Sequence, residues 1–189
     1  MNPNPELTVL LRAWQAGNQD ARNELFAHVN KNMYAIAKNL LRNDRQAKVL
    51  QPTDLVNECV IRMFGLNNLS WLDRAHFIGA TSSTMRRILV DESRRSSALK
   101  RDAIEVTLST AALGISNQSS AMSDLDSAMS KLSEVSPELL QVVELKFFGG
   151  LTNKEVAVVQ NVSEATVKRS WRAARAWLFN EILHPQHHE

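Results

Sequence analysis

An all-helical fold is predicted by two observations: chain breakers and strand patterns are both scarce, and apolar residues recur at helical spacing. The 189 residues include only 6 Gly and 5 Pro, so long stretches of the chain can remain helical. Runs in which β-branched residues alternate with polar ones, as in half-buried strands, are also scarce. Hydrophobic residues make up 44% of the chain, which is enough for real cores. We therefore expect an all-α protein of one domain or two small ones.

The first half of the chain is expected to form four helices. The apolar pattern of residues 6–30 is interrupted at Gly17-Asn18, which predicts a short helix, a turn and a second helix that continues through Leu40. Thr53 is a plausible N-cap for a third helix. Residues 65–75 are rich in Gly, Asn and Asp and predict a loop, and residues 75–95 predict a long fourth helix.

A change in composition divides the chain. From about residue 99 to 123 it is rich in Ser, Thr, Ala and Asn with little apolar periodicity, which predicts a flexible linker with at most short elements. We expect two small helical domains, 1–98 and 124–184, followed by a short tail at 185–189. In the second domain, Ser136 and Pro137 predict a helix start, and Gly149-Gly150 predicts its end.

The most informative local pattern is a helix-turn-helix near the C-terminus. Thr152 and Glu155 form a capping-box pattern at the start of a short helix. Asn161 tolerates the left-handed conformation that ends a helix sharply, and Ser163 then caps a second helix. Two short helices joined by a turn of three to four residues form a unit that places its second helix in the DNA major groove.

The second of these helices is basic on one side and apolar on the other. Its apolar stripe runs from Val167 through Trp171 to Leu178 at helical spacing, so that face can be buried. The alternative interpretation is an ordinary amphipathic helix with solvated charges. The capped turn just before it favours contact with DNA. The residues expected to face DNA are Glu164, Thr166, Lys168, Arg169 and Arg172.

Charge is clustered rather than large. The formal net charge is only +2, which by itself indicates no partner. Residues 86–101 nevertheless hold six basic residues against two acidic ones, and clustering of this kind is typical of a nucleic-acid footprint. The basic residues are Arg86, Arg87, Arg94, Arg95, Lys100 and Arg101.

Several other classes of protein are disfavoured. The single cysteine, Cys59, excludes an internal disulfide and is expected in the core. No apolar run approaches the roughly 20 residues that span a bilayer, and no signal peptide is evident, so a cytoplasmic protein is expected. The five histidines do not form a metal-ligand pattern and no Gly-rich phosphate loop occurs, so we expect no metal, no cofactor and no enzyme activity.

With these motifs in place, the chain resembles a sigma-70 family RNA polymerase sigma factor of the extracytoplasmic-function group (group 4). The segment from Pro52 to Phe64 is similar to the family's region 2.2 helix, and residues 76–95 are similar to its regions 2.3 and 2.4. Residues 136–178 are similar to region 4, which carries the family's helix-turn-helix. The resemblance covers nearly the whole chain except the linker and tail, and it implies that residues 1–98 are sigma domain 2 and residues 124–184 are sigma domain 4.

The resemblance implies an alternative sigma factor that binds the RNA polymerase core and directs promoter-specific initiation. By this resemblance, the helix at 54–62 would dock on the clamp helices of the β′ subunit. The contact would be made by residues that share a polar face, namely Asp54, Asn57, Glu58 and Arg62. By the same resemblance, sigma domain 4 would bind the −35 element of promoter DNA as a duplex, through the basic helix.

The resemblance also implies that the first domain binds the −10 element as a melted single strand. Unstacked bases need hydrogen-bonding pockets and the phosphate backbone needs positive charge. For Trp71 the alternative is simple core packing. The residues expected at the −10 element are Asn67, Asn68, Trp71, Arg86, Arg87, Arg94 and Arg95.

One departure from the family pattern indicates regulation. Many relatives carry an acidic motif where this chain has Gln51-Pro52-Thr53-Asp54, so two carboxylates are missing from a surface that meets a basic partner. Phosphorylation of Thr53 by a Ser/Thr protein kinase would restore negative charge there. Some relatives that lack the motif accompany such kinases rather than anti-sigma factors. The alternative hypothesis is that Thr53 is only an N-cap.

Two other functions remain open from the residues alone. One is a helix-turn-helix transcription regulator that does not act as a sigma subunit, although the first domain lacks the alternating strand and helix pattern of a receiver domain. The other is a helical interaction protein that binds no DNA. The sequence does not give the promoter consensus, the controlling signal or the arrangement of the two domains in the free protein. A compact inactive arrangement of the two domains is compatible with the sequence.

Overall fold

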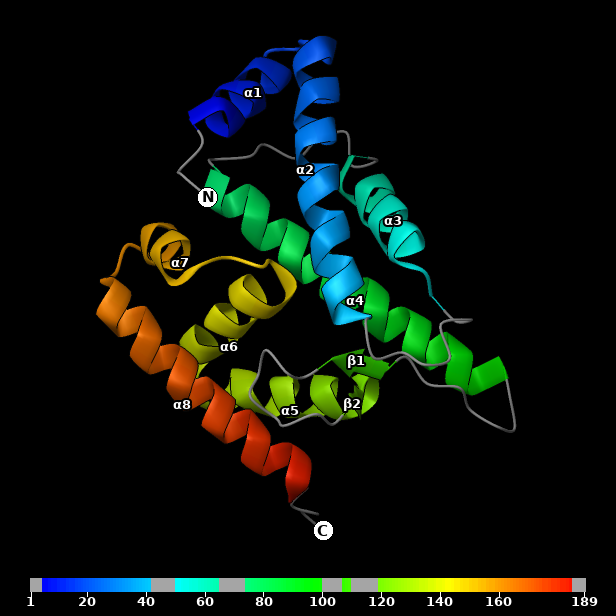
Figure 1. Ribbon diagram of the computed structural model, residues 1–189, viewed down its shortest axis with the longest axis vertical. Coiled ribbons are helices and arrows are strands. Elements are labelled where there is room, and N and C mark those ends of the chain that lie inside the picture. The colour runs from blue at the N-terminus through cyan, green and yellow to red at the C-terminus, as the bar shows by residue number, and fades with distance from the viewer. Residues whose placement is uncertain (1–4, 42–49, 65–73, 100–106, 110–118, 185–189) are drawn as a thin grey trace.

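The structure is a computed structural model that describes residues 5–41, 50–64, 74–99, 107–109 and 119–184 (Figure 1). The prediction of an all-α protein is confirmed. The helices of the first half are α1 (Pro5–Gln15), α2 (Gln19–Leu40), α3 (Pro52–Phe64) and α4 (Arg74–Leu99). Those of the second half are α5 (Met122–Val135), α6 (Pro137–Val143), the π-helical turn η2 (Glu144–Phe148), α7 (Asn153–Gln160) and α8 (Glu164–Leu183).

A small antiparallel ribbon lies within the segment predicted as a linker. Strand β1 (Thr107–Ser109) pairs with β2 (Ser119–Ala121), and Leu108 lies opposite Ser120 in the register. Strands of three residues agree with the expectation of at most short elements there. They leave the fold class unchanged.

The break between the first two helices is built by a glycine and a cap. Gly17 has φ +93°, a conformation that favours glycine, and it turns the chain after α1. The Asn18 side chain then accepts hydrogen bonds from the backbone N–H groups of Asp20 (2.9 Å) and Ala21 (3.1 Å). Asn18 is thus the N-cap of α2, which satisfies two donors of the first turn.

The sequence assignment of Thr53 as an N-cap is wrong. Helix α3 begins at Pro52, two residues earlier than a cap at Thr53 implies, because the Gln51 carbonyl already accepts from the backbone N–H groups of Asp54 (3.0 Å) and Leu55 (3.1 Å). The Asp54 carboxylate in turn accepts from the Gln51 N–H at 3.3 Å. Gln51 is therefore the cap and Pro52 the first helical residue, a position that suits proline because the N–H it lacks has no intrahelical acceptor. The Thr53 side chain is exposed within the first turn.

Helix α4 is the element that both halves of the chain share. It contacts α3 in the first half and α5 and η2 in the second half (Figure 1). Its buried residues Phe77, Met85 and Leu89 belong to one hydrophobic cluster, which continues from Leu25 of α2 to Leu125 of α5. A smaller second cluster, around Val156 and Val167, holds α7 and α8 together.

The two predicted domains are therefore in contact in the described residues. Phe148 of η2 is buried in the same cluster as Met33 of α2 and Met85 of α4. The division into 1–98, a linker at 99–123 and 124–184 stays a prediction as regards independent folding, and the tail at 185–189 lies outside the described residues.

Two glycines that follow η2 bring the backbone of the second half close to the first half. A Cβ atom added to Gly149 would lie 2.4 Å from the Ser82 hydroxyl of α4. A Cβ added to Gly150, which has φ +66°, would lie 2.8 Å from Cγ1 of Ile36 in α2. The helix stop predicted at Gly149-Gly150 is confirmed, and the same residues let the backbone pass close to α2 and α4.

Within the described ranges, none of the helices is long and apolar enough to cross a membrane.

Replacing Asn18 with alanine tests the cap of α2. Asn18→Ala should lower the free energy of unfolding by about 1 kcal/mol, because two backbone donors lose their acceptor. Urea denaturation followed by circular dichroism measures this change. Asn23→Ala is the matched control, since Asn23 is exposed in the same helix and outside its first turn. Equal stability of the two variants would contradict the capping role.

Candidate nucleic-acid interface

The helix-turn-helix has the local geometry that its sequence predicts. Thr152 accepts from the Glu155 backbone N–H at 3.3 Å, and the Glu155 carboxylate accepts from the Thr152 N–H at 2.9 Å, so the capping box is complete. Asn161 is left-handed with φ 53° and ψ 45°. Ser163 then caps α8 by accepting from the Thr166 N–H at 3.0 Å. A three-residue turn, 161–163, thus joins α7 to α8.

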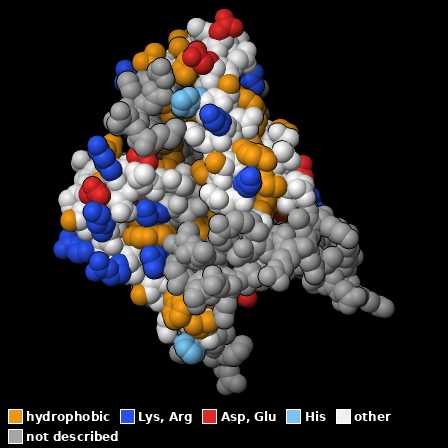
Figure 2. All heavy atoms as spheres, viewed as in Figure 1, with side chains coloured by type: hydrophobic (Ala, Val, Ile, Leu, Met, Phe, Trp, Pro, Cys, Tyr) orange, Lys and Arg blue, Asp and Glu red, His pale blue; other side chains and the backbone are white. Residues whose placement is uncertain are grey.

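Helix α8 buries one side and leaves its basic side free. Val167, Ala174 and Leu178 are fully buried, whereas the Lys168 side chain is 57% exposed. Figure 2 shows Lys and Arg side chains gathered at the left edge of the molecule, where α7 and the first half of α8 lie in Figure 1. The predicted residues Glu164, Lys168, Arg169 and Arg172 are all exposed, and Thr166 is half-buried.

Side-chain contacts along α8 order this surface without neutralising it. Lys168 pairs with Glu164 at 3.2 Å across one helical turn. Arg169 donates to the Thr166 hydroxyl at 3.4 Å. An exposed pair one turn apart is weak, so nucleic-acid phosphate can compete for Lys168.

Trp171 organises a second part of the surface that the sequence did not predict. The Lys146 ammonium of η2 lies 5.3 Å from the centroid of the Trp171 ring, and the Arg175 guanidinium lies 5.9 Å from it. Lys146 also donates to the Leu151 carbonyl at 3.3 Å. Burial lowers the pKa of Lys146 because desolvation disfavours its charged form. Nothing local in the sequence signals this site, since η2 and α8 are brought together only by packing.

A groove lies beside this ring. Asn153 of α7, Trp171, Arg172 and Phe179 are among the residues that line it. The Asn153 side-chain oxygen is buried and has no hydrogen-bond partner among the described residues. The polar and cationic residues of the groove continue the exposed face of α8, so the described surface that can meet DNA includes α7 as well.

The four arginines predicted for the −10 element lie on α4, but in different environments. Arg87, Arg94 and Arg95 are exposed. Arg86 is not: its side chain is 15% exposed and pairs with Asp126 at 2.8 Å and Glu144 at 3.0 Å. The sequence could not predict this pairing, because the two carboxylates lie 40 and 58 residues away.

The structure does not test the prediction that a loop at 65–75 holds unstacked bases. Asn67, Asn68 and Trp71 lie outside the described residues.

The polar residues predicted for polymerase docking share one side of α3. Asp54 and Asn57 are exposed, and Glu58 and Arg62 are half-buried. Arg62 bridges two carboxylates, donating to Glu58 at 2.8 Å and to Asp91 of α4 at 2.8 Å. The bonds of Arg62 connect the C-terminal end of α3 to α4. Asp54, at the N-terminal end of the same polar side, remains exposed.

Two further features of the described residues concern metal and thiol chemistry. No group of three or more His, Cys, Asp and Glu residues that could hold a metal occurs in the part of the chain that the structure describes. Cys59, the lone cysteine, is buried, and its burial raises the pKa of the thiol to about 12. A thiol of this kind is inert at neutral pH.

Comparison with known families decides which DNA-binding class this is. The family model described as ECF sigma factor matches residues 4–184, nearly the whole chain. The chain belongs to the ECF sigma factor family. No curated protein and no solved structure matches it.

Membership of this family assigns the function at a coarse level. An ECF sigma factor is an alternative sigma factor that directs transcription, so RNA polymerase core and promoter DNA are the partners of this chain. The family is not a class of enzymes. A regulator that does not act as a sigma subunit is correspondingly disfavoured.

Removing basic residues from α8 tests its contact with DNA. Lys168→Ala with Arg172→Ala should lower the affinity for duplex DNA and reduce the slope of log affinity against log salt by about 2, because each phosphate contact contributes about 0.9 to the slope. Fluorescence anisotropy with a mixed-sequence duplex at several salt concentrations measures both quantities.

The matched control removes two exposed basic residues from another surface. Arg12→Ala with Lys31→Ala changes the net charge equally on α1 and α2. If both double variants lose affinity and salt dependence to the same extent, α8 is not the contact surface.

Proposed function

We propose that this ECF sigma factor reads the −35 element with α8 and the −10 element with α4, and that phosphorylation of Thr53 activates it. The observation that carries the −35 assignment is the exposed basic face of α8 behind a fully capped turn. Lys168, Arg169 and Arg172 are free to meet phosphates and base edges, with Thr166 and Glu164 beside them. Arg87, Arg94 and Arg95 supply positive charge for the −10 strand.

The docking surface for core polymerase is proposed on α3. Asp54, Asn57 and Glu58 provide the polar, partly acidic contact to the β′ clamp helices, and Arg62 orients Glu58 through their 2.8 Å hydrogen bond. Complementary charge at such a surface affects both the rate and the strength of association. A chain that lacks two of the usual carboxylates should therefore bind weakly until charge is supplied.

Thr53 is suited to receive that charge. It lies in the first turn of α3, its side chain is exposed, and Gln51 rather than Thr53 caps the helix. Phosphate adds about −1.5 to −2 charge, which is favoured near a helix N-terminus. The modified residue would lie one helical turn before Asn57, at the edge of the polar side of α3 proposed to face polymerase, and this modification needs a Ser/Thr protein kinase as the third partner.

Promoter-specific transcription tests the sigma role itself. Purified core polymerase should initiate at a specific site only when this chain is added, because a repressor or activator cannot substitute for a sigma subunit. The template is genomic DNA, and mapped 5′ ends report the start sites. An absence of specific initiation with both the unmodified and the Thr53-phosphorylated chain would refute the proposal.

The affinity for core polymerase tests the switch. The Thr53-phosphorylated chain should bind about tenfold more tightly than the unmodified chain, since one to three charge-assisted contacts form. Thr53→Glu should give part of this gain. Asn23→Glu, which adds one negative charge on the exposed side of α2, is the control and should give none. Equal affinities of the phosphorylated and unmodified chains would remove the switch.

A further inference from the structure

Arg86 is held in an ion triad that joins the two halves of the chain. Its Nη2 donates to Asp126 Oδ1 of α5 at 2.8 Å, and its Nη1 donates to Glu144 Oε1 of η2 at 3.0 Å. The three side chains are 15%, 17% and 19% exposed. Arg94 lies at the edge, 3.7 Å from Asp126 and 76% exposed. The triad is thus largely shielded from water, where charge-assisted hydrogen bonds are screened least.

This pairing excludes nucleic acid from Arg86. Both terminal nitrogens of the guanidinium already donate to carboxylates, and the two halves cover the side chain. A phosphate group could reach Arg86 only if α4 separated from α5 and η2. Carboxylate and phosphate oxygens bind the guanidinium fork in the same way, so each can replace the other.

Close packing of the backbone after η2 against α2 and α4 also joins the two halves. Gly149 and Gly150 bring the backbone after η2 against Ser82 of α4 and Ile36 of α2, where an added Cβ atom would clash at 2.4 Å and 2.8 Å. Ser82 is fully buried, and its hydroxyl donates to the Ile78 carbonyl at 2.8 Å. This fit places Glu144, five residues earlier, in reach of Arg86.

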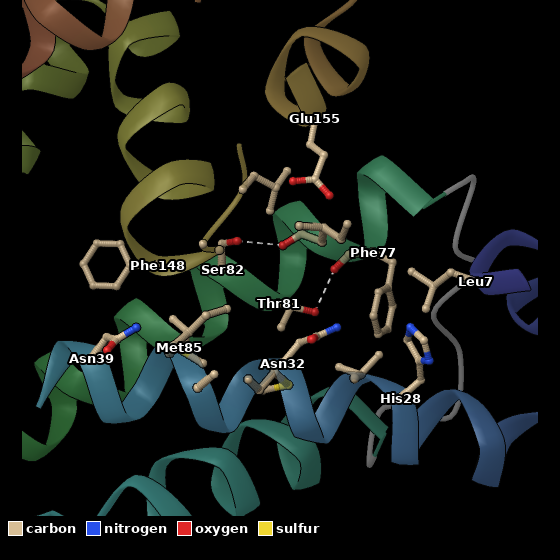
Figure 3. A pocket seen from close by; sticks show the side chains of 18 residues that line it. Leu7, His28, Asn32, Asn39, Phe77, Thr81, Ser82, Met85, Phe148 and Glu155 are labelled. Atoms are coloured by element: carbon tan, nitrogen blue, oxygen red, sulfur yellow. Dashed lines mark hydrogen bonds between the residues drawn. The ribbon is translucent and has the colours of Figure 1, made fainter. Parts of the chain in front are cut away.

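The contact is nevertheless incompletely packed. A hollow of about 350 Å³ lies next to the two glycines, between α2, α4 and the chain that leads into α7. Figure 3 shows Asn32 of α2 on one side of the hollow and Glu155 of α7 on the opposite side, with Ser82 and Met85 of α4 between them. Residues that line this open hollow face solvent instead of the other half, so the two halves bury less surface against each other than a fully packed core would.

The contact between the two halves affects α8 differently from α4. Its basic side chains remain exposed while Arg86 is covered. The closed arrangement therefore conceals part of one proposed DNA-binding surface and leaves the other accessible.

We propose that Asp126 and Glu144 act as an internal substitute for nucleic-acid phosphate and latch the free protein in a closed state. The latch rests on the proposed role of α4 at the −10 element. Contact of this part of α4 with the melted strand then requires Arg86 to exchange its two carboxylates for phosphate. The chain can still touch duplex DNA through α8 while closed, but it cannot present Arg86 of α4 to the melted strand.

The separation of the halves measures the latch directly. Cysteines placed at the exposed positions Asn23 of α2 and Asn180 of α8 carry a donor and an acceptor dye on the full chain. The native Cys59 is buried and has a pKa of about 12, so it takes no dye in the folded protein. Single-molecule energy transfer then reports the closed and open populations without polymerase.

Removing one carboxylate should open the chain. Glu144→Gln is expected to raise the ratio of open to closed molecules about tenfold or more, because Arg86 loses a charge-assisted bond. Asp126→Asn should do the same from α5. Glu181→Gln is the matched control: Glu181 is 14% exposed and pairs with Lys131, but both residues belong to the second half. Circular dichroism confirms that each variant is folded.

The outcomes separate the latch from the proposed function. An unchanged transfer efficiency in both Glu144→Gln and Asp126→Asn overturns the latch, as does equal opening in Glu181→Gln. In a supporting result, the two opened variants also bind a single-stranded DNA oligonucleotide several-fold more tightly than the parent chain and than Glu181→Gln, because phosphate can then reach Arg86. If they open but no form of the chain supports promoter-specific transcription, the latch stands and the sigma assignments fail.

Discussion

Helix α4 is packed on two sides, and this constraint governs the rest of the structure. Phe77, Met85 and Leu89 are buried within the cluster that joins both halves. A charged residue on such a helix must be compensated, because an unpaired charge shielded from water is costly. Arg86 is compensated in this way by ion pairs with Asp126 of α5 and Glu144 of η2. The position of the second half on the first follows from this pairing and from the two glycines beside it.

The two surfaces proposed to bind DNA are built by different means. The α8 surface depends on short-range signals: the capping box at Thr152, the left-handed Asn161 and the Ser163 cap set the helix, and Val167 and Leu178 bury its other side. The α4 surface depends on what packs against it. A local surface remains available in any arrangement of the chain, whereas a shared one can be covered or exposed.

Regulation by charge fits this construction. The first turn of α3 carries one acidic residue, Asp54, and Thr53 is exposed in the same turn. The α4 surface instead carries positive charge that the chain neutralises internally. Added charge at α3 and released charge at α4 would act on separate surfaces, one for polymerase and one for DNA, and both depend on electrostatic complementarity more than on a change of fold.

The sequence by itself determined the fold class, the helix-turn-helix and the family. These features depend on interactions within a few residues, so caps such as Thr152 and Ser163 and the glycine stop at Gly149-Gly150 can be recognised from spacing alone. It misplaced the start of α3 by two residues, because a cap at Gln51 leaves no strong sequence signal. Only the tertiary structure decided the environment of Arg86 and the place of Lys146 over Trp171. Both depend on residues distant in the sequence, whose meeting is set by the packing of whole helices and not by local preference.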